Sequence, residues 1–303
     1  MTTRLLKGLA ALFSLLPLSV ALAIGRGLGW ILGSVVRHRR SDVIEAISRS
    51  FPEKSEREVL QVVNGMYRHL GMNGVEFMRL LGGRSDQIDQ LVTVSGEEHV
   101  REALSRGKGV LALVSHVGNW EYLALSIARL FHPTGIIIKD IKKSDLNDYL
   151  VESREAQGIK IFLRRGAYRA CVRALRENML IGFVLDQNMR ATEGAFVDFF
   201  GRPACTTLGL AHMAARSQCP IVPIFIERKP GGRHEVTVQP LLEPPGSRDL
   251  EELEAATALY TSIIEEAVRK HPEQWTWIHR RWRTKRPETV AVEEEAGSAP
   301  VAG

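Results

Sequence analysis

The chain reads Gly109-Val-Leu-Ala-Leu-Val-Ser-His-Val-Gly-Asn-Trp-Glu121 at the point that decides its fold. Residues 110–115 form a short apolar run, which predicts a buried strand. Asn119 is a favourable N-cap and predicts a helix over residues 120–131. His116 is therefore expected at the carboxyl end of a strand, which is where open α/β sheets bind their ligands.

Strands and helices alternate on both sides of this stretch. Further short apolar runs predict strands at residues 92–94, 136–138, 159–162, 180–185, 221–226 and 236–238. Helical patterns between and after these runs cover residues 97–105, 145–157, 168–177, 208–217 and 249–270. This alternation predicts an α/β fold with a mostly parallel central sheet flanked by helices on both faces.

Three regions differ in composition. Residues 1–40 are largely apolar, residues 41–287 carry the helical and α/β patterns, and residues 288–303 are small and acidic. We expect an N-terminal membrane anchor or interfacial helical segment at residues 1–40, one folded domain at residues 41–287 and a disordered tail at residues 288–303. Within the domain, Ser55 followed by Glu58 predicts a capping box at the start of a helix.

The N-terminal segment contains two apolar runs. Residues 9–24 and 28–36 are separated by Arg26, and the second run ends in the basic residues 37–40. An anchor in or on the membrane fits this pattern, and the basic flank predicts a cytoplasmic position for the domain that follows. Two alternatives stay open, namely a signal peptide cleaved after residues 21–23 and a pair of buried core helices.

The composition limits the classes of protein. The chain has 303 residues, of which 45% are hydrophobic, and a formal net charge of +5. It is long enough for a large core and basic enough to favour an acidic partner. The three cysteines include no C-x-x-C pair, which argues against a disulfide framework or a zinc site and favours a reducing compartment. No nucleic-acid-binding motif accompanies the positive charge, so we expect no nucleic-acid partner.

His116 and Glu121 are candidates for acid–base chemistry. On one continuous helix, a spacing of five residues would point their side chains about 140° apart. A turn through Gly118 lets them meet, so that the carboxylate accepts the imidazole N–H and leaves the other ring nitrogen free as a base. A hydroxyl of the substrate can then be the attacking group. The competing interpretation is a structural histidine, with Glu121 as a favourable charge in the first turn of a helix.

The stretch from His116 to Glu121 resembles the H-x4-D/E motif of glycerolipid-type acyltransferases. Its Gly-Asn-Trp-Glu form is typical of the late acyltransferases of lipid A biosynthesis. Further parts of that family's pattern follow in order over most of residues 5–287, at residues 51–53, 107–111, 186–187, 199–206, 220–223, 271–277 and 281–282. One departure is that residues 46–50 lack the Asn-Leu pair that many members carry there.

The resemblance implies a glycerolipid acyltransferase-like fold and an enzyme of the inner membrane that needs neither a metal nor another cofactor. It implies acyl carrier protein as the acyl donor and an anionic membrane lipid, a lipid A precursor of lipopolysaccharide biosynthesis, as the acceptor. In that family's chemistry His116 deprotonates the acceptor hydroxyl and Glu121 orients His116. Backbone N–H groups near Gly118, and an arginine from the pair Arg164-Arg165, would stabilise the oxyanion.

Polar residues also follow two other predicted strands. Arg164 and Arg165 come after residues 159–162, and the resemblance places a catalytic or acceptor-binding arginine here, for which we favour Arg165. Asp186 and Gln187 end the strand at residues 180–185. Asp186 is expected to pair with Arg165 or to position the acceptor, unless it is only a turn residue. Gly118, Asn119, Arg164, Asp186 and Gln187 are thus our candidates for substrate binding.

Two further patterns have more than one interpretation. Arg165, Arg169, Arg173 and Arg176 share one helix face, which fits acceptor phosphates, anionic headgroups, an acidic carrier protein or plain solvent. Aromatic residues at 196, 199 and 200 would line an acyl-chain cavity or simply pack, and tryptophans at 275, 277 and 282 would form an interfacial belt.

The motif acts on a hydroxyl and does not specify the rest of the acceptor. An acyltransferase for another glycolipid or an aminolipid therefore remains an alternative. A membrane-binding protein without turnover is a second alternative, against which the intact His116 and Glu121 count.

Overall fold

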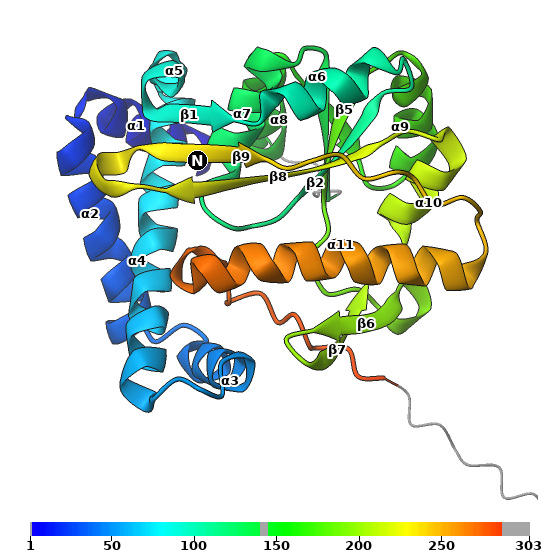
Figure 1. Ribbon diagram of the computed structural model, residues 1–303. Coiled ribbons are helices and arrows are strands. Elements are labelled where there is room, and N and C mark those ends of the chain that lie inside the picture. Colours follow the sequence, from blue (N-terminus) through cyan, green and yellow to red (C-terminus); the bar gives the residue numbers. More distant parts are fainter. Residues whose placement is uncertain (1, 140–144, 287–303) are drawn as a thin grey trace, which may run out of the picture.

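The computed structural model describes residues 2–139 and 145–286. Its centre is a seven-stranded sheet in the order β1-β9-β8-β2-β5-β3-β4, beside a two-stranded sheet of β6 and β7 (Figure 1). The strands are β1 (Val92–Ser95), β2 (Val110–Val114), β3 (Thr134–Ile138), β4 (Ile159–Leu163), β5 (Leu180–Val184), β6 (Ala195–Phe199), β7 (Arg202–Thr206), β8 (Ile221–Arg228) and β9 (His234–Val238). Every pair in the larger sheet is parallel except β8 with β9.

Helices surround this sheet. The α-helices are α1 (Thr2–Leu15), α2 (Leu18–Trp30), α3 (Arg40–Ser50), α4 (Glu56–Leu81), α5 (Ile88–Leu91), α6 (Glu97–Ser105), α7 (Trp120–Leu130), α8 (Asp145–Glu155), α9 (Ala167–Arg176), α10 (Gly209–Ser217) and α11 (Leu250–Lys270). The remaining helices are the π-helix η1 (Ile31–Val35) and the 3₁₀ helices η2 (Arg84–Gln87), η3 (Ala191–Glu193), η4 (Pro230–Gly232) and η5 (Pro272–Gln274).

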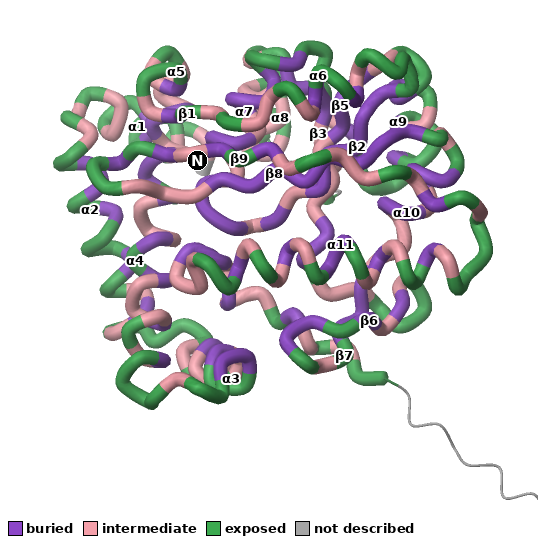
Figure 2. Tube along the Cα trace, in the orientation of Figure 1, coloured by how far each residue is buried: buried purple, intermediate pink, exposed green. Residues whose placement is uncertain are grey.

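The sheet separates two hydrophobic cores, and its central strands are mostly buried (Figure 2). On one face, α6 and α7 contribute residues such as Val100 and Leu123. On the other face, α9, α10 and α11 form the larger core together with α3 and α4. Because both faces are covered, the parallel strands carry continuous apolar runs, and these runs are what made the strands recognisable in the sequence.

The N-terminal helices pack against α4. A Cβ atom added at Gly25 or Gly29 of α2 would collide with the backbone of α4 near Gly71 and Tyr67, so glycine is what allows the two helices to approach. The outer surface of this region is apolar, because eleven of the sixteen most exposed large hydrophobic residues lie between residues 5 and 36. Leu18–Val35 is long and apolar enough to cross a membrane, and 28% of this segment is buried in the protein.

The tryptophans near the C-terminus lie in the core. Trp275 and Trp277 are 1% and 2% exposed, and their rings contact each other and those of Phe199 and Phe200. The prediction of an interfacial belt is therefore wrong for these two residues. Phe199 and Phe200 pack in the same cluster because the β6–β7 hairpin brings them against the segment that follows α11.

The structure confirms the predicted fold class, with all seven predicted strands in one mostly parallel sheet. It adds a hairpin that the sequence analysis missed, β6–β7, whose turn has positive φ at both Phe200 and Gly201. This is the geometry of a tight two-residue hairpin turn, which Asn-Gly or Asp-Gly pairs predict and a Phe-Gly pair does not. The predicted tail at residues 288–303 lies outside the described residues, as does residue 287.

Candidate active site

His116 and Asp186 lie side by side at the ends of neighbouring strands. Val114 of β2 is paired with Val184 of β5, and His116 and Asp186 each follow two residues later. His116 Nδ1 lies 2.8 Å from Asp186 Oδ1, and the His116 backbone N–H donates to Oδ2 at 2.7 Å. Trp275 Nε1 donates to the same carboxylate at 2.8 Å. Asp186 is thereby fixed in place beside the imidazole.

The charge states of the pair follow from this geometry. Burial by itself raises the pKa of the Asp186 carboxyl, but the imidazole and the hydrogen bonds lower that pKa to about 2. An ionised carboxylate only accepts hydrogen bonds, so the His116 proton lies on Nδ1 and Nε2 carries the lone pair. Burial lowers the pKa of His116, but the charge and the hydrogen bond of Asp186, together with the charge of Glu121, outweigh burial and raise the pKa above its ordinary value. His116 is thus arranged as a base at Nε2.

Glu121 does not hold the imidazole, contrary to our expectation. Its carboxylate is bound by Arg154 of α8, with Nη2 at 2.7 Å from Oε1 and Nε at 3.1 Å from Oε2. Glu121 is still close enough for its charge to help raise the pKa of His116. The prediction relied on closeness in the sequence, whereas strand pairing brings Asp186 to the imidazole from 70 residues away.

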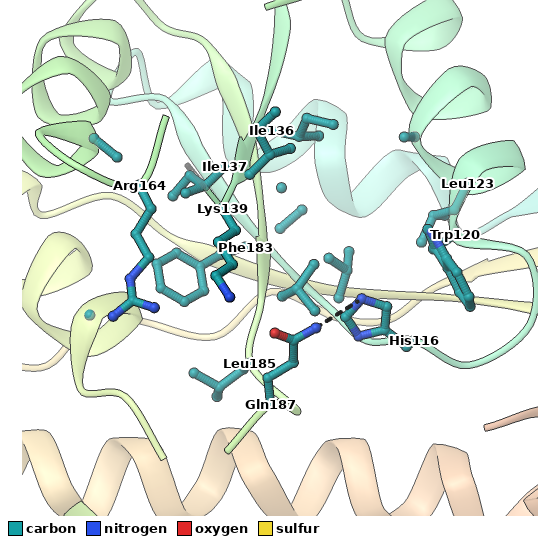
Figure 3. A pocket seen from close by; sticks show the side chains of 18 of the residues that line it. His116, Trp120, Leu123, Ile136, Ile137, Lys139, Arg164, Phe183, Leu185 and Gln187 are labelled. Atoms are coloured by element: carbon teal, nitrogen blue, oxygen red, sulfur yellow. Dashed lines mark hydrogen bonds between the residues drawn. The ribbon is translucent and has the colours of Figure 1, made fainter. Parts of the chain in front are cut away.

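An apolar cavity of about 500 Å³ opens at His116 (Figure 3). Its wall is drawn from the ends of β2, β3 and β5 and from α7, α9 and α10, and includes Val114, Leu123, Ile127, Ile136, Phe183 and Met213. Small-molecule sites are typically apolar hollows of roughly 300–1,000 Å³ with a few polar groups. Here the polar groups include His116, Gln187 and the Glu121–Arg154 pair, so the cavity suits a long apolar chain with its reactive end at His116.

A basic cleft of about 910 Å³ adjoins this cavity. Its basic side chains are Arg39, Lys139, Arg164, Arg165, Arg190, His279, Arg280 and Arg283, and the one acidic residue among its lining residues is Glu193. Gln187 lines both hollows, and its Nε2 lies 3.4 Å from His116 Nε2. Such a cleft fits an anionic group.

The arginine pair divides between the two hollows. Arg164 lies on the wall of the apolar cavity, across from His116 in Figure 3, and also lines the cleft. Arg165 lines the cleft but not the apolar cavity. The structure therefore favours Arg164 for contact with a ligand in the cavity, whereas we expected Arg165. Asp186, which we expected to pair with Arg165 or to position the acceptor, holds His116 instead.

Gly118 and Asn119 shape the loop and line neither hollow. Gly118 has φ of +64°, and a Cβ there would collide with the Ile226 carbonyl, so no other residue fits. Asn119 is 1% exposed. Its Oδ1 accepts from the N–H groups of Glu121 and Tyr122 and so caps α7, as predicted. Neither residue is placed to contact a substrate with its side chain, which corrects our expectation for both.

A buried polar network from α4 holds this loop. His69 Nε2 and Asn73 Nδ2 lie 3.1 Å and 2.7 Å from the Gly118 carbonyl oxygen. Burial, followed by the charge of Arg228, lowers the pKa of His69 to about 3, so His69 is neutral. A neutral ring can donate from Nε2 while its Nδ1 accepts from Arg228 at 3.3 Å.

Glu76 is the centre of the network. It is fully buried and binds both terminal nitrogens of Arg228, at 2.6 Å and 2.5 Å. Its Oε2 also accepts from Asn119 Nδ2 at 2.6 Å, and His234 lies 3.3 Å from Oε1. A buried carboxylate persists only when it is paired in this way. The ion pair therefore ties α4, β8 and β9 to the loop that carries His116.

The model of the bacterial lipid A biosynthesis acyltransferase family matches residues 2–284. The chain belongs to this family. It is an acyltransferase, as the resemblance implied.

Relatives of this acyltransferase differ in their acceptors. It is 28% identical over 279 residues to a lipid A biosynthesis lauroyltransferase of Escherichia coli, which spans 91% of this chain and 89% of the relative. A lipid A biosynthesis acyltransferase of Haemophilus influenzae is 26% identical, over 89% and 86% of the two chains. A phosphatidylinositol mannoside acyltransferase of Mycobacterium tuberculosis is 23% identical over 65% of this chain and 61% of the relative.

Several residues around His116 of this acyltransferase were not predicted from the sequence. Arg154 carries no local signal, because its partner Glu121 lies on another helix. Trp275 was interpreted as part of an interfacial belt, and its hydrogen bond to Asp186 was not predicted. His69, Asn73 and Glu76 did carry a signal, since these three polar residues are spaced by four and three positions and share one face of α4.

Proposed function

We propose that this enzyme transfers a fatty acyl chain from acyl carrier protein to a hydroxyl of a lipid A precursor at the membrane. His116 acts as the general base and Asp186 holds it. The observation that carries this proposal is the His116–Asp186 contact at the mouth of an apolar cavity, with a basic cleft beside it. The cavity supplies a site for the chain and the cleft a site for an anionic acceptor.

The reaction balances with these groups. His116 Nε2 takes the proton of the acceptor hydroxyl as its oxygen attacks the thioester carbonyl carbon. The new C–O bond forms and the C–S bond breaks. The imidazolium, stabilised by Asp186, returns the proton to the departing thiolate. His116 is regenerated, and the products are an ester and the free carrier thiol.

The oxyanion of the tetrahedral intermediate requires donors. The Gly118 carbonyl points to α4, where His69 and Asn73 bind it. In a trans peptide the N–H points the opposite way, so the Asn119 N–H is directed away from α4. Among the residues that the structure describes, none accepts from this N–H. Because Asn119 lines neither hollow, Arg164, which lines both, is the donor that we propose for the charge of the intermediate and of the acceptor.

Membrane association is supported by the N-terminal helices. Their exposed side chains form an apolar surface over α1, α2 and η1, beside the basic residues 37–40. An amphipathic surface of this kind lies in the membrane interface, with basic residues toward anionic headgroups. We propose that this surface rests on the inner membrane, with the catalytic domain in the cytoplasm.

The test is a panel of acyl carrier protein thioesters and lipid acceptors, with products measured by mass spectrometry. We expect transfer to a lipid A precursor from the wild-type enzyme and none from His116→Ala, which should fold normally. Wild-type turnover by that variant would overturn the mechanism.

A second acceptor class has one observation in its favour, the relative named for phosphatidylinositol mannoside acylation. The same panel includes mannosylated phosphatidylinositol. Transfer to this acceptor, with none to lipid A precursors, would replace the proposed acceptor and leave the role of His116 intact.

A further inference from the structure

Helix α9 carries an exposed basic face. Arg169, Arg173 and Arg176 are exposed and spaced by four and three residues, which places them together on the solvent side of the helix. The opposite side buries Ala167, Cys171, Ala174 and Leu175 in the core. The three guanidinium groups therefore form one positive surface on this helix. The rise per residue of an α-helix places the outer two arginines about 10 Å apart along the helix axis.

These arginines differ from the other arginines around the site. Arg154, Arg164 and Arg228 each bind a carboxylate. In the described ranges 2–139 and 145–286, Arg169, Arg173 and Arg176 form no ion pair. Neighbouring like charges on a helix face repel one another, so an acidic partner would relieve a repulsion that the protein itself leaves uncompensated.

The N-terminal end of α9 lies at the apolar cavity. Ala167 and Tyr168, the first two residues of the helix, line the cavity together with Arg164 just before it. A protein bound on the arginine face would thus lie next to this part of the cavity wall.

The position of α9 distinguishes between the anionic partners that the sequence left open. In Figure 1, α9 lies at the opposite end of the molecule from α1 and α2. The apolar surface that we assign to the membrane is on α1 and α2, so anionic headgroups of that membrane do not face α9. The cleft between Arg164 and Arg283 already offers a separate site for acceptor phosphates. A soluble acidic protein is the partner that fits the remaining geometry.

We infer that Arg169, Arg173 and Arg176 are the docking surface for the acidic carrier protein that delivers the acyl thioester. This inference rests on the proposed donor. It assigns the first contact with the carrier to α9, from which the thioester-bearing arm extends to His116. Contacts of this kind mainly raise the rate of association and weaken with salt.

The experiment compares two donors with the same acyl chain, the acyl carrier protein thioester and the acyl-pantetheine thioester, which lacks the protein. The variant is R173E/R176E, and the control is R57E/R248E, which reverses two exposed arginines elsewhere. We expect kcat/KM with the carrier to fall about tenfold or more in R173E/R176E at low salt. The pantetheine donor, the control variant and the charge-conserving R173K/R176K should stay near wild-type values.

Every other outcome counts against the inference. Equal losses with both donors, or no loss with the carrier, would show that α9 does not dock the carrier. Equal losses in R57E/R248E would show a general charge effect. A wild-type enzyme that uses pantetheine but not the carrier would refute the donor and the docking surface together, while transfer from neither donor would refute the proposed function itself.

Discussion

At His116, a buried aspartate does what the neighbouring glutamate was expected to do. Glu121 was identified because it follows His116 within one motif, and its position in the first turn of α7 was predicted correctly. Asp186 was recognised only as a polar residue at a strand end, since its role depends on β5 lying next to β2. Local patterns predict strands but not their order in the sheet. Arg164 and Arg165 show the same limit, because a difference of one position decides which side chain enters the cavity.

Gly182 allows a test of whether the acyl chain occupies the apolar cavity. It lies in β5 on the cavity wall, and a Cβ there would meet only Ile136 Cγ2 at 3.4 Å and the Gly135 oxygen at 3.7 Å. A larger side chain can therefore enter the cavity without displacing the strand. We expect Gly182→Val to shift the preferred acyl chain to shorter lengths, because each methylene excluded from the cavity forfeits about 0.8 kcal/mol.

The measurement is competition among acyl thioesters of graded length, with Gly74→Ala as the control, since that position on α4 is open. An unchanged length preference in a folded Gly182→Val enzyme would show that the chain does not pass this strand.

Among the secondary-structure elements, α4 connects the N-terminal helices α1 and α2 to the loop that carries His116. Its capping box at Ser55 and Glu58 was predicted and is present. Its polar residues at 69, 73 and 76 were given no role, because their hydrogen-bond partners, Arg228 and the Gly118 loop, come from distant parts of the sequence. Helix and strand boundaries were predicted to within a few residues, whereas the β6–β7 hairpin was missed because its Phe-Gly turn resembles a loop.

Asn73 tests whether this network positions the catalytic loop. Asn73→Ala removes the 2.7 Å hydrogen bond to the Gly118 carbonyl and the 2.7 Å contact with Arg228. We expect the free energy of unfolding to fall by roughly 1–3 kcal/mol, the usual cost of leaving buried polar groups unpaired. The value of kcat should fall as well, with KM for the donor near its wild-type value.

Thermal unfolding and steady-state kinetics provide the two readouts, and Gln61→Ala on the exposed side of α4 is the control. A destabilised Asn73→Ala enzyme with full kcat would mean that the network supports the fold and not the loop.

For the whole molecule, the distribution of exposed apolar side chains is the basis of the membrane orientation that we propose. Leu12, Leu15 and Leu28 are 54%, 83% and 50% exposed on α1 and α2, while Leu250 and Leu259 on α11 are 62% and 50% exposed. We expect L12Q/L15Q/L28Q to lose most of its binding to anionic vesicles and L250Q/L259Q to bind as wild type. Co-sedimentation with vesicles measures the binding of both variants. Equal binding by the two variants would show that α1 and α2 do not form the membrane-binding surface.

The dependence of kcat/KM on pH in Asp186→Asn, compared with Glu121→Gln, tests the central claim most directly. Asp186 raises the pKa of His116, and only the neutral imidazole is a base, so wild-type activity falls as the pH drops through this raised pKa. Asp186→Asn should shift that fall to lower pH and reduce the plateau roughly 10⁴-fold, the loss known for changing the aspartate that orients a catalytic histidine to Asn. Glu121→Gln should cause a smaller shift, because its charge makes a smaller contribution. An unshifted profile in Asp186→Asn, or a larger shift in Glu121→Gln, would contradict the pairing of His116 with Asp186.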